Sequence, residues 1–196
     1  MNHENQTFKS NVAGYLANHS IVVPTCFTDN NGGRGLHNGH VYNFDLQTMA
    51  APGHVHIQGG AFLVLLTIMA NRGLATGFFT SNINAMWLEG PSGAATAHAN
   101  LPPAGINFIF TVSLGGCSVY INGGQIFHNP HNVVPVGVPA NQRLVDPYPG
   151  TAGNFDQTCA VAYFTGGAWH IGGSVPHDNG PFHRTHAGSG YRYLGY

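Results

Sequence analysis

The stretch from Phe108 to His131 constrains the fold of this chain most. It contains three apolar or β-like segments, which cover Phe108–Leu114, Val119–Ile121 and Gln125–Phe127. The turn Asn122-Gly123-Gly124 separates the last two, and Asn-Gly between such segments is the strongest short-range signal for a β-hairpin. The sequence therefore predicts an antiparallel hairpin in which Cys117 opens one arm and His128 closes the other.

The hairpin would bring a thiol and an imidazole together. Partners across an antiparallel pair lie about 4.5–5.5 Å apart, so we expect Cys117 and His128 to face each other. Gly115 and Gly116 leave room for a close backbone approach or a positive φ just before the thiol. A thiol, a base within reach and an uncluttered backbone amide are what nucleophilic cysteine chemistry needs. The alternative, an inert buried cysteine beside a structural histidine, stays open.

The residues around Cys117 carry a resemblance to a known family. Phe110 to Cys117 resembles the nucleophile segment of the bacterial glutamine-deamidase toxins, which include the cytotoxic necrotizing factors and the Burkholderia lethal factor. The matching positions are Thr111, Leu114, Gly116, Cys117, Gly123, Gly124 and His128. Gly115 stands where the family motif has Ser, and the interval from Cys to His is one residue shorter than in the lethal factor.

The resemblance implies a fold and an activity. It implies an α/β fold with a β-sandwich core of mixed sheets, peripheral helices and long loops, formed by residues 1–196 as a single catalytic domain. The activity implied is that of a hydrolase, a toxin or virulence effector that converts a target-protein Gln to Glu through a Cys-His dyad. Cys117 would be the nucleophile, His128 the base, and Thr111 would orient the His128 ring through its side chain or carbonyl. No metal or organic cofactor is implied.

Composition narrows the class of protein. Only 7% of the residues are charged and 28 of the 196 are glycine, a turn-rich composition that favours strands over helices. The formal net charge of −1 shows no excess of positive charge that would attract nucleic acid or an anionic membrane. The resemblance implies a host protein substrate carrying the target Gln as the partner, and we expect a monomer.

Three cysteines, Cys26, Cys117 and Cys159, cannot all pair within one chain, which argues against a disulfide scaffold and fits a thiol working in a reducing cytosol. The N-terminus MNHENQTFKS lacks the charge pattern of a secretory signal. If the chain is a bacterial effector, we expect secretion or delivery into the host cytosol by a route that the sequence does not reveal.

Periodicity gives a coarse element order. Apolar residues at helical spacing predict a helix over residues 4–18. We expect strands over Ile21–Val23, His40–Leu46, His54–Ile57 and Ile83–Leu88, with Trp87 in the core. The apolar run Ala61–Met69 is interpreted as one arm of a hairpin with Leu74–Thr80, and Cys159–Phe164 as an arm of another with Ala168–Val175. Residues 89–103 and 129–155 are interpreted as loops.

Other histidines and cysteines offer weaker sites. His54 and His56 share a strand face and could ligate zinc, but they lack a third ligand at a compelling spacing. The group of His177, His183 and His186, near Asp178, is interpreted as solvated imidazoles. His131 is the rival base, although Pro130 should turn it away. Cys26 has no histidine across a readable hairpin, and Cys159 is expected to pack in the core.

Two further functions remain open. A non-enzymatic β-sandwich module could bind carbohydrate or protein through its Gly/Asn-rich loops and the aromatic tail of Tyr191, Tyr193 and Tyr196. The same Cys-His dyad could also serve a cysteine hydrolase or a transglutaminase.

Overall fold

The computed structural model describes residues 3–23, 27, 36–49, 61–68, 82–92, 94–145 and 158–177. Its helices are α1 (His3–Ser10), α2 (Val12–Asn18) and the 3-10 helix η3 (Ala140–Gln142). The first six strands are β1 (His19–Val22), β2 (Val41–Met49), β3 (Phe62–Ile68), β4 (Ile83–Leu88), β5 (Ala97–Asn100) and β6 (Phe108–Leu114). The others are β7 (Ser118–Asn122), β8 (Gln125–Asn129), β9 (Arg143–Val145), β10 (Thr158–Thr165) and β11 (Ala168–Gly173).

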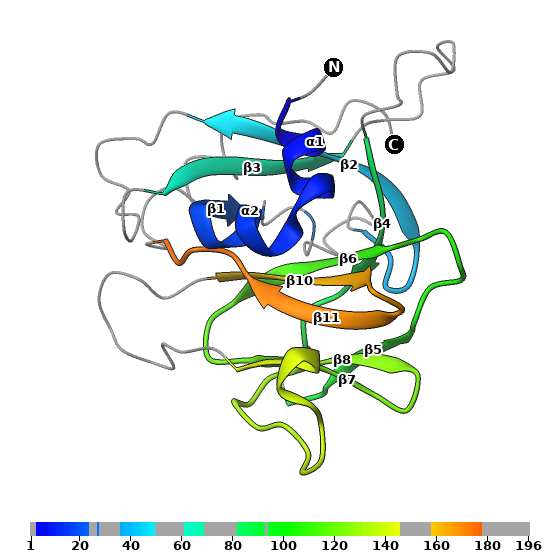
Figure 1. The fold of residues 1–196 in the computed structure, drawn as a ribbon. Coiled ribbons are helices and arrows are strands. Elements are labelled where there is room, and N and C mark those ends of the chain that lie inside the picture. The colour runs from blue at the N-terminus through cyan, green and yellow to red at the C-terminus, as the bar shows by residue number, and fades with distance from the viewer. Residues whose placement is uncertain are drawn as a thin grey trace.

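In the described part of the chain the strands form two sheets (Figure 1). The larger runs β1-β3-β2-β4-β6-β10-β11, and the smaller runs β5-β8-β7-β9. The larger sheet is mixed, because β1 pairs with β3 and β4 pairs with β6 in parallel, whereas its other pairs are antiparallel. This arrangement confirms the predicted α/β class with a β-sandwich core and peripheral helices.

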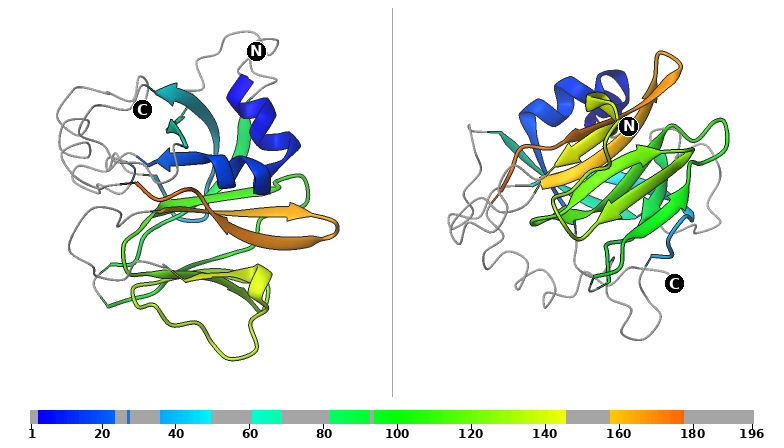
Figure 2. Two further views of the ribbon diagram at one scale, coloured as in Figure 1. Left: turned by 60° about the vertical axis from the view of Figure 1, so that its left-hand side comes forward. Right: turned by 90° about the horizontal axis from the view of Figure 1, so that it is seen from below.

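Strand β6 lies between two hydrophobic cores. Phe110 belongs to a core shared with Phe8 of α1 and Leu16 of α2. Ile109, on the opposite face of β6, belongs to a second core shared with Val119 of the smaller sheet. The two helices therefore cover one face of the larger sheet and the smaller sheet lies against the other, as Figure 2 also shows. Strand alternation on β6 produces both cores.

The predicted single helix over residues 4–18 is wrong, because the structure has two helices that meet at Asn11. The Asn11 Oδ1 accepts a hydrogen bond from the Gly14 N–H at 2.9 Å and so caps α2. Asn favours this N-cap geometry over a helix interior.

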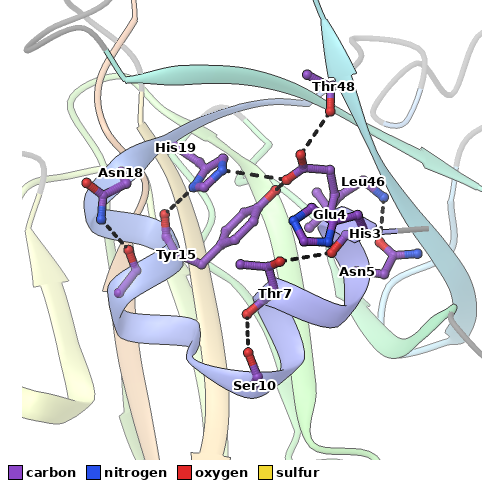
Figure 3. A network of polar contacts seen from close by, with 11 residues as sticks. His3, Glu4, Asn5, Thr7, Ser10, Tyr15, Asn18, His19, Leu46 and Thr48 are labelled. Atoms are coloured by element: carbon purple, nitrogen blue, oxygen red, sulfur yellow. Dashed lines mark hydrogen bonds and ion pairs between the residues drawn. The ribbon is translucent and has the colours of Figure 1, made fainter. Parts of the chain in front are cut away.

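Polar contacts tie α1 to the larger sheet (Figure 3). Both oxygens of Glu4 accept hydrogen bonds, Oε2 from the Tyr15 hydroxyl at 2.7 Å and Oε1 from the Thr48 hydroxyl of β2 at 2.9 Å. The ring of His19 stacks on Tyr15 and its Nε2 lies 3.5 Å from Glu4 Oε2. The side-chain amide of the neighbouring Asn5 donates a hydrogen bond to Asp45 Oδ1 and accepts one from the Leu46 N–H.

Most strand predictions are confirmed and two loop predictions are wrong. The apolar run after residue 60 is a strand, β3, which pairs with β1 and β2; the second arm expected for it, Leu74–Thr80, and the strand His54–Ile57 lie outside the described residues. The Cys159–Phe164 hairpin is present as β10 and β11. The expected loops contain β5, η3 and β9. Strands β5 and β9 are short and pair at the two edges of the smaller sheet, so tertiary partners specify them.

The central hairpin forms as predicted, from β7 and β8. Gly123 and Gly124 adopt φ values of 56° and 79°, the left-handed conformation that this turn requires of its residues. Strand β8 continues through His128 to Asn129, so His128 lies within the arm and not just beyond it. No helix among the described residues is both long and apolar enough to cross a membrane.

Candidate active site at the Cys117 end of the hairpin

His128 joins the two sheets. Its side chain shares the inward face of β8 with Ile126 and is 0% exposed. Thr111 lies on β6 of the larger sheet and is also buried. The Thr111 Oγ1 lies 2.9 Å from the His128 Nδ1, a hydrogen bond across the sandwich. The prediction that a Thr111 oxygen lies within hydrogen-bond reach of this ring is confirmed, and the oxygen is the hydroxyl.

Burial determines the protonation state of His128. Desolvation lowers the pKa of its imidazole to about 4, because a buried cation loses its hydration. The ring is therefore neutral at pH 7, which favours a neutral base over a preformed thiolate–imidazolium pair. Its Nε2 has no hydrogen-bond partner among the described residues. When Nδ1 carries the proton and donates to Thr111, Nε2 keeps the lone pair that a base needs.

Cys117 lies just before β7 and is partly exposed. Gly116 takes a φ of 87°, which confirms the positive φ expected beside the thiol, and a side chain there would meet nothing within 4 Å. The thiol packs at the margin of the inter-sheet core to which Val119 belongs. The nucleophile candidate is thus within reach of solvent, whereas the base candidate is not.

The expected direct pairing of Cys117 and His128 is wrong. In the observed register Val119 lies opposite His128, and Cys117 comes two residues earlier. Residues two apart on a strand share a face, so Cys117 is a diagonal neighbour of His128, an offset of about 7–8 Å between Cα atoms in regular pairs. Direct pairing of Cys117 with His128 would need the register of the hairpin to shift by two residues.

The other cysteine and histidine candidates differ in how deeply they are buried. Cys159 is 0% exposed, as predicted for a cysteine that packs in the core. Burial raises the pKa of its thiol to about 12. His131, the rival base, is exposed. The interpretation of His177 as a solvated imidazole is wrong, because it is buried with Nδ1 3.0 Å from Ser20 Oγ.

Several predicted residues lie outside the described residues, namely Cys26, His54, His56, Asp178, His183, His186, Tyr191, Tyr193 and Tyr196. Within the described ranges, no group of three or more His, Cys, Asp or Glu side chains could hold a metal ion. Gly115 is exposed at the start of the turn that carries Cys117.

Two residues that the sequence interpretation missed, Ser118 and Asn129, hold the turn that follows β8. Ser118 Oγ lies 3.0 Å from the His131 carbonyl and 2.8 Å from the Val133 carbonyl. Asn129 Oδ1 accepts a hydrogen bond from the His131 N–H at 2.9 Å. The Asn129-Pro130 dipeptide is a readable signal for such a turn, but the contact with Ser118 is not readable.

The chain matches no known family model, and no curated protein shows significant similarity to it. The assignment of a function therefore depends on the chemistry that Cys117, His128 and Thr111 can perform.

Proposed function

We propose that this protein is a cysteine-dependent protein glutamine deamidase, a toxin or effector similar to the lethal factor and the necrotizing factors. The observation that carries the proposal is the hydrogen bond between Thr111 Oγ1 and His128 Nδ1. It fixes a buried imidazole whose Nε2 lacks a partner among the described residues, one diagonal step from a partly exposed thiol. A lone pair on Nε2 that no described residue occupies is what a base at this position needs.

In the first step His128 acts as the general base. Its Nε2 takes the Cys117 proton, and the thiolate attacks the carboxamide carbon of the target Gln. Backbone N–H groups of Gly116 and Cys117 stabilise the oxyanion, worth about 3–4 kcal/mol per donor in comparable sites. Gly115 and Gly116 give this backbone its conformation. Thr111 holds the ring in the tautomer that keeps the lone pair of Nε2 available.

In the second step the C–N bond breaks. The imidazolium returns its proton to the leaving nitrogen, ammonia departs and a thioester remains on Cys117. His128 then deprotonates a water molecule that attacks the thioester carbon. The C–S bond breaks, the thiolate is reprotonated, and Glu is released. The low pKa of His128 makes the imidazolium a strong acid, suited to protonating the leaving amine.

Intact-mass analysis of host-lysate proteins tests the activity. Incubation with the protein should add about one dalton to a target, whereas the Cys117→Ser variant should leave that target unchanged, because a serine hydroxyl is far harder to ionise. Incorporation of an added primary amine would assign transglutamination instead. Equal mass gain with Cys117→Ser would remove Cys117 from the reaction.

A second candidate, a β-sandwich module that binds carbohydrate, is favoured by an aromatic row on the outer face of the smaller sheet. The ring of Phe127 stacks on Tyr120 at 5.0 Å and on His98 at 5.8 Å between centroids. Tyr120 is buried, so Phe127 and the exposed His98 supply the accessible part of this row. Glycan binding that Phe127→Ala abolishes and Cys117→Ser leaves intact would support this candidate.

A further inference from the structure

Strand β6 contains a β-bulge directly beside Thr111. The strand lies between β4 and β10 in the larger sheet (Figure 1). Its pairing with β10 shifts by one residue at this point, since Thr111 and Val112 both lie opposite the single residue Ala160. A bulge leaves one residue out of the ladder and changes where the neighbouring side chains point. This bulge is therefore a feature that can direct the Thr111 side chain.

The bulge allows two residues of β6 to face the smaller sheet from positions three apart. The Thr111 hydroxyl lies 2.9 Å from His128 Nδ1, and Leu114 packs in the core between the two sheets. In a regular strand, residues three apart point to opposite faces. On the other side of β6, the parallel pairing with β4 stays regular as far as Leu88 and Thr111. The irregularity thus begins immediately after Thr111, at Val112.

Gly90, two residues beyond the end of β4, makes room for the bulge. A Cβ atom at this position would lie 2.8 Å from Val112 Cγ2, closer than real Cβ contacts allow. Gly90 does not have a positive φ, so space and not backbone conformation requires glycine here. Val112 is β-branched and stiff at χ1, and its side chain packs against the core under the helices. A methyl group at position 90 would therefore displace the Val112 backbone, and with it the adjacent Thr111.

We propose that the close contact between Gly90 and Val112 sets the bulge of β6 and thereby aims the Thr111 hydroxyl at His128 Nδ1. Gly90 and Val112 are positioning residues, since they act on the imidazole through Thr111. Their catalytic consequence rests on the proposed deamidase function, whereas the aim of Thr111 can be measured without it. The inference gives a role to a glycine that lies in a segment interpreted from the sequence as a loop.

Gly90→Ala tests the proposal through the His128 ring itself. In the wild type, the buried Nδ1 proton donated to Thr111 should give a slowly exchanging NMR signal, identified by its absence from His128→Gln. Gly90→Ala should abolish this signal and lower the rate of the Cys117-dependent mass gain of lysate proteins about tenfold, as expected for the loss of one buried hydrogen bond. Gly90→Ala/Val112→Ala should restore both, because the Cβ atom of residue 112 lies 3.7 Å from the added methyl group, an ordinary contact.

Gly172→Ala provides the matched control. A Cβ atom there would also lie 2.8 Å from a side-chain atom, Leu16 Cδ1, but Gly172 is on β11, two strands from β6. Any loss of stability in this variant should leave the His128 signal and the rate at wild-type values. If Gly90→Ala fails to fold, two Val112 variants decide. Val112→Leu moves the branch away from Gly90 and should lose the signal, whereas Val112→Thr keeps the branch and should retain it.

The proposal is overturned if the wild type lacks the His128 signal, or if Gly90→Ala keeps the wild-type signal or rate. An equal loss in Gly172→Ala, no recovery in Gly90→Ala/Val112→Ala, or a signal retained by Val112→Leu would also overturn it. The expected signals together with no Cys117-dependent mass gain by the wild type would instead reject the deamidase function alone, so the two failures are distinguishable.

Discussion

The hydroxyl of Thr111 is the contact that orients the His128 ring. Thr111→Val keeps the shape of the side chain but leaves Nδ1 buried without a partner, which costs about 1–3 kcal/mol. We expect at least a tenfold lower rate of Cys117-dependent ammonia release. Thr111→Ser keeps the hydroxyl and should stay within a small factor of the wild type. A Val variant with wild-type turnover would remove Thr111 from the site.

His128 should make stability depend on pH. Its pKa is about 4 in the folded state against an ordinary 6.5, so between these values the unfolded chain binds more protons. The free energy of unfolding should therefore fall as the pH drops from 6.5 to 4, by about 3 kcal/mol over the window. Urea titrations of wild type and His128→Gln should show this extra slope in the wild type alone. Parallel pH profiles would contradict the burial argument.

The two described cysteines should differ sharply in reactivity. Cys117 is partly exposed, whereas Cys159 is 0% exposed and its thiol has a raised pKa of about 12. Only thiolates alkylate readily. Iodoacetamide at neutral pH should modify Cys117 and leave Cys159 unmodified until the protein unfolds, as peptide mapping would show. His128→Gln should slow the Cys117 reaction; an unchanged rate would point to His131 as the base.

At the level of elements, the contact between Glu4 and Tyr15 fastens α1 to α2, and the Thr48 contact fastens α1 to β2. Burial and then the Glu4 carboxylate raise the pKa of the Tyr15 hydroxyl, so it remains a donor. Tyr15→Phe keeps the ring stacked on His19 and removes one hydrogen bond. We expect a loss of about 0.5–1.5 kcal/mol in the free energy of unfolding, measured in urea. The Thr48→Val variant provides the matched control for the β2 contact, and a neutral Tyr15→Phe would show that the pair adds no stability.

At the level of the whole molecule, β6 makes the two cores depend on each other. Phe110 packs in the core under the helices, while Ile109 and Leu114 pack in the core between the sheets. Loss of either core should therefore unfold both. Leu114→Ala should cost about 2–5 kcal/mol and still unfold in one step, with equal calorimetric and van't Hoff enthalpies. Two separate transitions would show that the smaller sheet unfolds independently.

The sequence by itself determined the elements whose causes are local. The central hairpin follows from Asn122-Gly123-Gly124 between apolar segments, and the positive φ of Gly116 follows from the Gly-Gly step before Cys117. Strand β4 with its buried Trp87 follows from a short apolar run. Thr111 was placed at His128 by motif resemblance and not by strand geometry. Turn chemistry and side-chain alternation act over a few residues, so they are readable without a partner.

Only the tertiary structure decided the features that depend on a second segment. Strands β5 and β9 exist because edges of the smaller sheet pair with them, and Ser118 is buried because the turn after β8 folds over it. The neutral state of His128 likewise comes from burial between two sheets. The register that places Val119, not Cys117, opposite His128 is by contrast local, because the two-residue loop Gly123-Gly124 fixes it. Pairing between separate segments and desolvation are properties of the packed molecule, and no single stretch of sequence encodes them.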